Sequence, residues 1–131
     1  NAALLRALRK GQVRDAILDV WEGEPQLNQE LLHEVFIGTP HIAGYSADGK
    51  VNADNMVVAA LCEHFHVARP SLITPPALPS DFHYNGSPLD LYNPFSDSEP
   101  LKQHPESFEQ LRNNYPVRRE KYTQKAKNMH T

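Results

Sequence analysis

The stretch Ala16-Ile17-Leu18-Asp19-Val20-Trp21-Glu22-Gly23-Glu24-Pro25 begins as an apolar run and ends in an acidic turn that contains Gly and Pro. We predict a strand over residues 15–21 that is apolar on both faces, as is typical of a parallel sheet covered by helices. A helix over residues 28–35, capped by Asn28, and a short strand over residues 35–37 follow. The order strand, helix, strand predicts an α/β fold.

The sequence on either side of this stretch predicts two further helices. Residues 1–10 form a helix that Gly11 ends, and residues 52–67 carry apolar side chains at helical spacing. Because apolar side chains extend around the second helix, we expect it to be buried on more than one side.

Proline marks a change of character in the second half of the chain. Eight of the 11 prolines lie in residues 70–105, a density that breaks regular structure. We predict an extended connector over residues 69–80 and a strand over residues 81–86. Further along, a helix has one apolar face, which consists of Phe108, Leu111 and Tyr115. This region has few apolar residues, so we expect it to need a partner surface.

The composition limits the class of protein. The chain has 131 residues, of which 40% are hydrophobic, and a mean hydropathy of −0.57. No apolar run approaches the ~20 residues that span a bilayer. The single cysteine, Cys62, cannot form an internal disulfide, which suits a cytoplasmic protein. Residues 101–131 carry 7 Lys/Arg and 3 Asp/Glu within a net charge of −3. We interpret this basic segment as a solvated or docking surface and not as a nucleic-acid site, because few aromatic residues accompany it.

A carboxylate and an imidazole predict a proton-transfer site. Glu24 lies in the acidic turn, and His41 follows the second predicted strand in the segment Pro40-His41-Ile42-Ala43-Gly44. Open α/β sheets collect their reacting groups at the carboxyl ends of the strands. An imidazole exchanges protons near neutral pH, and a neighbouring carboxylate fixes which ring nitrogen faces the substrate. The two residues are 17 positions apart, and the helix over residues 28–35 allows the chain to return between them.

Each candidate residue also has a plainer interpretation. His41 is alternatively a hydrogen-bonded turn histidine, and Glu24 a solvated turn acid. Glu22 and Glu24 both flank Gly23, but only Glu24 precedes a proline, which restricts its backbone to extended conformations. Asp19, at the end of the first strand, is either a ligand contact or an acid that caps a helix or ends the strand.

Gly44 and Tyr45, which follow His41, also have two interpretations each, and the remaining histidines raise the question of a metal site. Gly44 either lets a cofactor approach closely or relieves a tight turn. Tyr45 either contacts a ligand or packs as an aromatic side chain. His64 and His66 are two positions apart on a predicted helix and so point in different directions, whereas zinc-binding helices present histidines at i and i+4. We expect no metal site.

Three short motifs together resemble the D-isomer-specific 2-hydroxyacid dehydrogenases. They are Leu18-Asp19-Val20-Trp21, Glu22-Gly23-Glu24-Pro25 and Pro40-His41-Ile42-Ala43-Gly44. Three further stretches resemble one member of that family, which carries an additional dimerisation region. These are Asn1-Ala2-Ala3-Leu4-Leu5, Gly44-Tyr45, and Phe108-Glu109-Gln110-Leu111-Arg112-Asn113-Asn114-Tyr115 with Arg118-Arg119-Glu120.

The resemblance implies a role for each candidate residue. His41 would be the catalytic acid/base and Glu24 its partner. Asp19 and Gly44 would contact the cofactor NAD, and Tyr45 would contact a phosphorylated 2-hydroxy acid substrate. The resemblance further implies a homodimer and no nucleic-acid or membrane partner.

The resemblance also implies a fold class and a domain organisation. The fold is α/β: the rear part of a Rossmann-like nucleotide-binding domain plus a small α+β C-terminal dimerisation domain. Residues 1–46 would end the NAD-binding domain, residues 47–68 would cross toward the substrate domain, residues 69–80 would form a linker, and residues 81–131 would form the dimerisation domain.

Two features of the family have no counterpart in this sequence. They are the G-x-G-x-x-G phosphate loop and the arginine that holds the substrate carboxylate. The first residue, Asn1, is also not a methionine. We therefore expect a C-terminal part of a longer enzyme that is inactive alone. Two alternatives stay open: a glycerate- or hydroxypyruvate-type dehydrogenase of the same family, and a non-catalytic dimerisation or interaction module.

Overall fold

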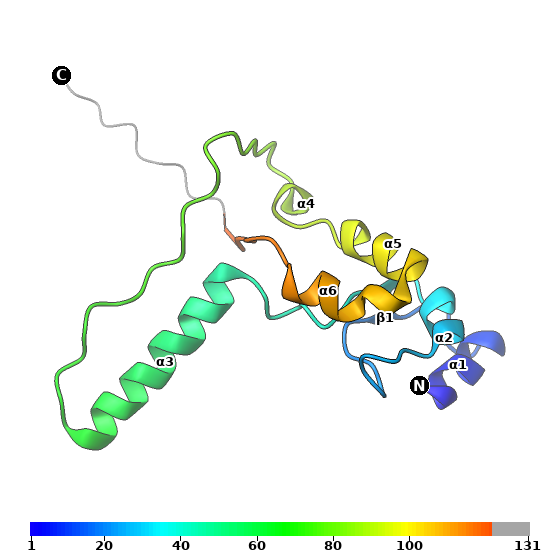
Figure 1. The fold of residues 1–131 in the computed structure, drawn as a ribbon, viewed down its shortest axis with the longest axis horizontal. Coiled ribbons are helices and arrows are strands. Elements are labelled where there is room, and N and C mark those ends of the chain that lie inside the picture. The colour runs from blue at the N-terminus through cyan, green and yellow to red at the C-terminus, as the bar shows by residue number, and fades with distance from the viewer. Residues whose placement is uncertain (122–131) are drawn as a thin grey trace. The chain divides into compact units, whose positions relative to one another are not determined.

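The computed structural model of the protein describes residues 1–121 (Figure 1). The chain divides into two compact units. Unit 1 consists of residues 1–45 and 93–116, and unit 2 contains residues 46–92 and, in the described part of the chain, residues 117–121.

Unit 1 begins with two helices that alternate with two short parallel strands. Helix α1 spans Ala2–Arg9 and α2 spans Gln29–Glu34. Strand β1, Ile17–Leu18, pairs in parallel with β2, Ile37–Gly38. The two predicted helices are confirmed, and so are the end signals at Asn28 and Gly11, whereas the side chain of Asn1 makes no capping hydrogen bond to α1. The Asn28 side chain accepts a hydrogen bond from the Leu31 amide, and Gly11 follows α1 with a φ of +67°.

The strands are shorter than the sequence predicts. We expected strands over residues 15–21 and 35–37, whereas only two residues of each pair as strand. In the described structure, β1 has the single neighbour β2, and the side chain of Ile17 is 67% exposed. The prediction that this strand is covered on both faces is therefore wrong for this chain.

A hydrophobic cluster joins the first part of unit 1 to its last part. Helix α5 spans Phe95–Gln103 and α6 spans Phe108–Asn113, with a 3-10 turn at Pro105–Ser107 between them. Leu101 and Phe108 pack into the same buried cluster as five side chains from the first 35 residues: Leu5, Trp21, Leu31, Leu32 and Val35. Burial of each large apolar side chain contributes about 1.5–3 kcal/mol. The cluster thereby fixes α6 near the segment after β2.

Hydrogen bonds also fix the position of α5 along β2 and α2, which apolar packing alone would leave less specific. The buried Ser98 hydroxyl accepts a hydrogen bond from the Gly38 amide at 3.0 Å. The Lys102 ammonium donates to the Val35 carbonyl oxygen at 2.6 Å, at the carboxyl end of α2, where a cation also complements the helix dipole. Specific hydrogen bonds therefore tie α5 both to β2 and to the end of α2.

Unit 2 is built around one long helix. Helix α3 spans Ala47–Phe65 and begins five residues earlier than predicted, because the Ser46 side chain caps it by accepting from the Gly49 amide. Cys62 is its only buried residue. Four large apolar side chains of α3 are more than half exposed, namely Met56, Val57, Leu61 and Phe65. The expectation that this helix is buried on more than one side is wrong for this chain.

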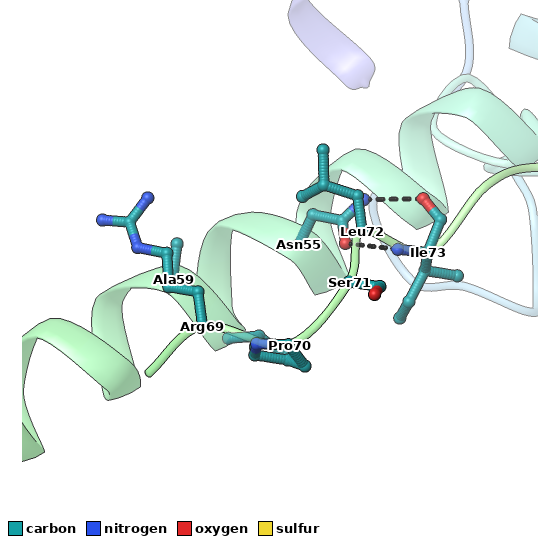
Figure 2. A pocket seen from close by; sticks show the side chains of 8 residues that line it. Asn55, Ala59, Arg69, Pro70, Ser71, Leu72 and Ile73 are labelled. Carbon is teal, nitrogen blue, oxygen red and sulfur yellow. Dashed lines mark hydrogen bonds between the residues drawn. The ribbon is translucent and has the colours of Figure 1, made fainter. Parts of the chain in front are cut away.

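Residues 67–86 contain no helix or strand, which agrees with an irregular connector but makes the predicted strand over residues 81–86 wrong. The Phe82 amide instead closes a turn onto Pro79, and no described strand lies beside it. Asn55 of α3 holds the connector by donating to the Ile73 carbonyl and accepting from the Ile73 amide, at 2.9 and 3.0 Å (Figure 2). The cavity beside this clasp has a volume of about 70 Å³, below the 300–1,000 Å³ of ligand pockets.

A short helix and an ion pair complete unit 2. Helix α4, Pro88–Leu91, carries a capping box made by Ser87 and Asp90. Near the N-terminus of α3, the Arg119 guanidinium makes two hydrogen bonds to the Asp48 carboxylate, at 2.8 and 3.1 Å. Those hydrogen bonds lower the pKa of Asp48 below its ordinary value of 3.8.

The described fold is therefore a mixed, helix-rich α/β structure. None of the described helices is long and apolar enough to span a membrane. The predicted dimerisation domain, residues 81–131, extends into residues 122–131, which lie outside the described part. A dimer involves a second chain, so this assignment stays a prediction.

Candidate functional site

The structure brings His41 and Glu24 into contact. The Nδ1 atom of His41 lies 2.9 Å from the Oε2 atom of Glu24. The His41 side chain is 41% exposed and that of Glu24 is 21% exposed. The imidazole is therefore held on one side by a carboxylate and remains accessible to a substrate on the other. Glu22, the alternative acid of the turn, is 78% exposed.

Glu24 is held in place by the turn that carries it. Its second carboxylate oxygen, Oε1, accepts a hydrogen bond from the Trp21 amide at 2.7 Å. The Trp21 indole lies in the buried cluster and donates from Nε1 to the Thr39 carbonyl oxygen at 2.9 Å. A carboxylate with both oxygens engaged has little freedom to rotate, so Glu24 presents a fixed acceptor to the imidazole.

Asp19 shapes the loop that carries His41. Its Oδ1 atom accepts from the Thr39 hydroxyl and the Ile42 amide, both at 2.7 Å, and Oδ2 accepts from the Ala43 amide at 3.0 Å. His41 itself has a φ of 56°, a left-handed conformation that costs a non-glycine residue about 1–2 kcal/mol. Three hydrogen bonds to one carboxylate stabilise the residues on either side of it. Asp19 is thus a loop-shaping acid in this chain, and a contact with NAD stays a proposal.

Gly44 lies on the exposed side of the same loop. A methyl group added at its Cα would meet no atom of the chain within 4 Å, and its backbone is not in the left-handed region. Neither a tight turn nor packing within the described chain therefore requires glycine here. The open space around Gly44 leaves room for a ligand that needs close approach to the backbone.

Tyr45 packs against two side chains from the far end of unit 1. Its ring lies edge-on to Tyr115, with centroids 6.1 Å apart, and the Arg112 guanidinium carbon is 5.5 Å from its centroid. The Nε atom of Arg112 also points at the His41 carbonyl oxygen, at 3.4 Å. Sequence reasoning missed Arg112 because no local pattern connects it to His41, 71 positions earlier. Thr39 was missed for the same reason.

These residues meet at the carboxyl ends of β1 and β2, where open α/β sheets bind nucleotides. The described residues offer no glycine-rich turn for the phosphates of a nucleotide. Within residues 1–121, no three His, Cys, Asp or Glu side chains come together as a metal site.

Comparison with known proteins finds a domain family that matches the start of the chain and relatives that align with most of it. Residues 1–43 match the model of the D-isomer specific 2-hydroxyacid dehydrogenase NAD-binding domain. Over 90% of the chain, the sequence is 52% identical to an erythronate-4-phosphate dehydrogenase of Bacteroides thetaiotaomicron and 54% identical to one of Bacteroides fragilis. An erythronate-4-phosphate dehydrogenase of Escherichia coli is 41% identical over 92% of the chain.

The chain spans about a third of the length of these relatives, 35% of the two Bacteroides proteins and 36% of the E. coli protein. His41, Glu24 and Asp19 all fall in residues 1–43, the part that matches the NAD-binding domain. Residues 1–43 are therefore similar to the NAD-binding domain of the D-isomer specific 2-hydroxyacid dehydrogenases, and the chain as a whole is similar to about a third of the length of two erythronate-4-phosphate dehydrogenases.

Proposed function

We propose that this chain forms part of an NAD-dependent dehydrogenase that oxidises 4-phospho-D-erythronate to (R)-3-hydroxy-2-oxo-4-phosphobutanoate, a step in the biosynthesis of pyridoxal 5′-phosphate, vitamin B6. The observation that carries the proposal is the 2.9 Å contact between His41 and Glu24 in a segment that matches an NAD-binding dehydrogenase domain. The homology to enzymes named for this substrate supports the choice of substrate.

The proposed chemistry removes two hydrogens from the carbinol group of the substrate. The Nε2 atom of His41 takes the proton of the 2-hydroxyl group while the C–H bond of the same carbon breaks and the carbonyl forms. NAD, when bound, supplies the acceptor for the hydride. Glu24 accepts a hydrogen bond from Nδ1, which leaves Nε2 with the lone pair that receives the proton.

The remaining candidate residues would orient the reactants. Asp19 shapes the His41 loop and would face the nicotinamide end of the cofactor, and Gly44 would let the cofactor lie against the backbone. Tyr45 would contact the phosphorylated substrate. A preorganised loop is useful here because a displacement of about 1 Å between reacting groups costs about 10²-fold in rate.

The proposal includes an organisation and a location. Residues 1–46 would close the NAD-binding domain, residues 47–68 would cross to the substrate domain, residues 69–80 would link, and residues 81–131 would mediate a homodimer. The irregular backbone of residues 67–86 supports the linker. Sedimentation equilibrium of the full-length protein tests the dimer. A cytoplasmic location is supported by the single cysteine.

The test is NAD reduction by the full-length protein with 4-phospho-D-erythronate or glycerate as the substrate, together with NADH oxidation when hydroxypyruvate, the 2-oxo acid of the reverse reaction, is supplied. His41→Asn is expected to lower kcat/KM by about 10²–10⁴-fold, and Glu24→Gln by a smaller factor. His33→Asn and Glu22→Gln are matched controls on exposed side chains of unit 1 and should have no effect. Equal turnover of His41→Asn and wild type would refute the assignment. A preference for glycerate would favour the alternative, a glycerate- or hydroxypyruvate-type dehydrogenase of the same family.

A further inference from the structure

Arg112 stands next to the candidate site although it comes from a distant helix. Helix α6 packs through Phe108, which is 2% exposed, and through Leu111, which borders the same cluster. The Tyr115 hydroxyl also donates to Asp97 of α5 at 2.9 Å. The core of unit 1 therefore determines where Arg112 lies, and the side chain is half-buried there.

The contacts of Arg112 leave most of its hydrogen-bonding capacity available. Its Nε faces the His41 carbonyl oxygen at 3.4 Å, and its guanidinium lies over Tyr45. Within residues 1–121, it makes no ion pair, whereas Arg9 and Arg119 of the same chain bind carboxylates. The two terminal nitrogens of the guanidinium can therefore donate to an added anion. A guanidinium is permanently charged and matches the oxygens of phosphate in a two-pronged geometry.

The comparisons indicate which anion this is. The general dehydrogenase domain matches residues 1–43 and does not reach α6, whereas relatives named for a phosphorylated substrate align over 90% of the chain, a span that must include α6. The phosphate distinguishes those relatives by name from dehydrogenases of 2-hydroxy acids in general. Arg112 is a positive side chain of α6 that lies beside the proposed acid/base His41, and such a side chain is suited to bind the phosphate.

We propose that Arg112, stacked on Tyr45, holds the phosphate group of the substrate at the His41–Glu24 site. This inference rests on the proposed function and deepens it, since it assigns the selectivity for a phosphorylated acid to α6. Tyr45 acts as the flat surface that orients the guanidinium.

The experiment uses the full-length protein with Arg112→Gln, and with Arg9→Gln as a control that removes the same charge from an exposed site of unit 1, where Arg9 is 51% exposed. We expect Arg112→Gln to raise KM for 4-phospho-D-erythronate by about 10- to 100-fold. Its kcat/KM for erythronate, which lacks the phosphate, should stay at the wild-type value. Arg9→Gln should change neither. A parallel loss on both substrates would overturn the proposal, because Arg112 would then only position His41 or hold the carboxylate.

A binding measurement separates this inference from the proposed function. Inorganic phosphate titrated into the full-length protein and followed by calorimetry should bind to wild type and to Arg9→Gln, and about 10-fold or more weakly to Arg112→Gln. This holds even if no dehydrogenase activity is found, in which case the proposed function alone fails. Equal phosphate binding by all three proteins, or none by wild type, overturns the role of Arg112. If Arg112→Gln does not fold, Arg112→Lys, which keeps the charge without the fork, is compared with Arg9→Lys by the same two measurements and should weaken phosphate binding selectively.

Discussion

Unit 1 buries seven hydrophobic side chains in one cluster, whereas the 19-residue helix of unit 2 buries only Cys62. Unit 1 then ties polar groups to that cluster, as when the Trp21 indole binds Thr39. Unit 2 is instead held by polar clasps, those of Asn55 with Ile73 and of Asp48 with Arg119. Every candidate site residue lies in unit 1.

This difference explains why a precise arrangement of site residues is found in unit 1. Positions held by a packed core move little, because each displacement opens a void or a clash. The left-handed backbone of His41 and its contact with Glu24 depend on such a core. An exposed helix that is held by a few hydrogen bonds offers no comparable constraint.

The largest expected effect compares one leucine in each unit. Leu101→Ala removes a fully buried side chain from the cluster and should lower the free energy of unfolding by about 2–5 kcal/mol. Leu61→Ala changes a side chain that is 52% exposed and should stay within about 0.5 kcal/mol. Chemical denaturation of the 131-residue chain measures both. Equal losses would mean that the two units do not differ in packing.

A second prediction tests how tightly the strand end meets the core. A Cβ added at Gly38 would lie 2.8 Å from a ring carbon of Trp21 and 2.9 Å from Leu32. Gly38→Ala should therefore cost about 1–3 kcal/mol through overpacking. The crowded ring is that of Trp21, whose amide holds Glu24, so kcat of the full-length protein should fall as well. Unchanged stability would show that the indole relaxes away freely.

A third prediction concerns the polar clasp of unit 2. Asp48→Asn should weaken the hydrogen bonds to Arg119 and to the Glu120 amide by about 1–2 kcal/mol, roughly 5- to 30-fold in local opening. Faster hydrogen exchange would report this loss at the Glu120 amide and at the Ala47 amide, which donates to the carbonyl oxygen of the neighbouring Arg118 at 2.8 Å. The control is Asp54→Asn, which changes an exposed acid of the same helix and should leave the exchange of both amides unaltered.

The pH dependence of this clasp has a definite sign. Because the folded pKa of Asp48 is lowered, its contribution is fully present above the ordinary value of 3.8 and is lost as the pH falls through the folded pKa. The difference in exchange between wild type and Asp48→Asn should therefore be largest near neutral pH and disappear in acid. A difference that persisted at a pH well below 3.8 would contradict an origin in the ionised carboxylate.

The sequence predicted those helix ends that depend on a single residue and its neighbours. Asn28 and Gly11 mark helix ends through their own side-chain or backbone chemistry, and both predictions are confirmed. The lengths of β1 and β2 depend on which strands lie beside them, which local sequence does not encode. The extent of burial of α3 likewise depends on what surrounds it.

The elements that were missed depend on distant packing. The polar sequence of α5 contains Pro100 within the helix, and its single deeply buried leucine, Leu101, gives no periodic pattern. The contact between His41 and Glu24 could be expected from strand-end logic, but the place of Arg112 could not. It depends on how α6 packs on the core, and therefore on contacts made across the whole of unit 1.

The smallest effect on stability is expected at Gly44, where the same change as at Gly38 meets open space. Gly44→Ala should leave the free energy of unfolding within about 0.5 kcal/mol of wild type. If NAD lies against this backbone, the added methyl group should weaken NAD binding by the full-length protein about tenfold, as measured by fluorescence titration. Unchanged affinity would remove Gly44 from the proposed cofactor site. The two variants make the same change six positions apart. Gly38→Ala tests whether the core requires glycine, and Gly44→Ala tests whether a bound ligand requires it.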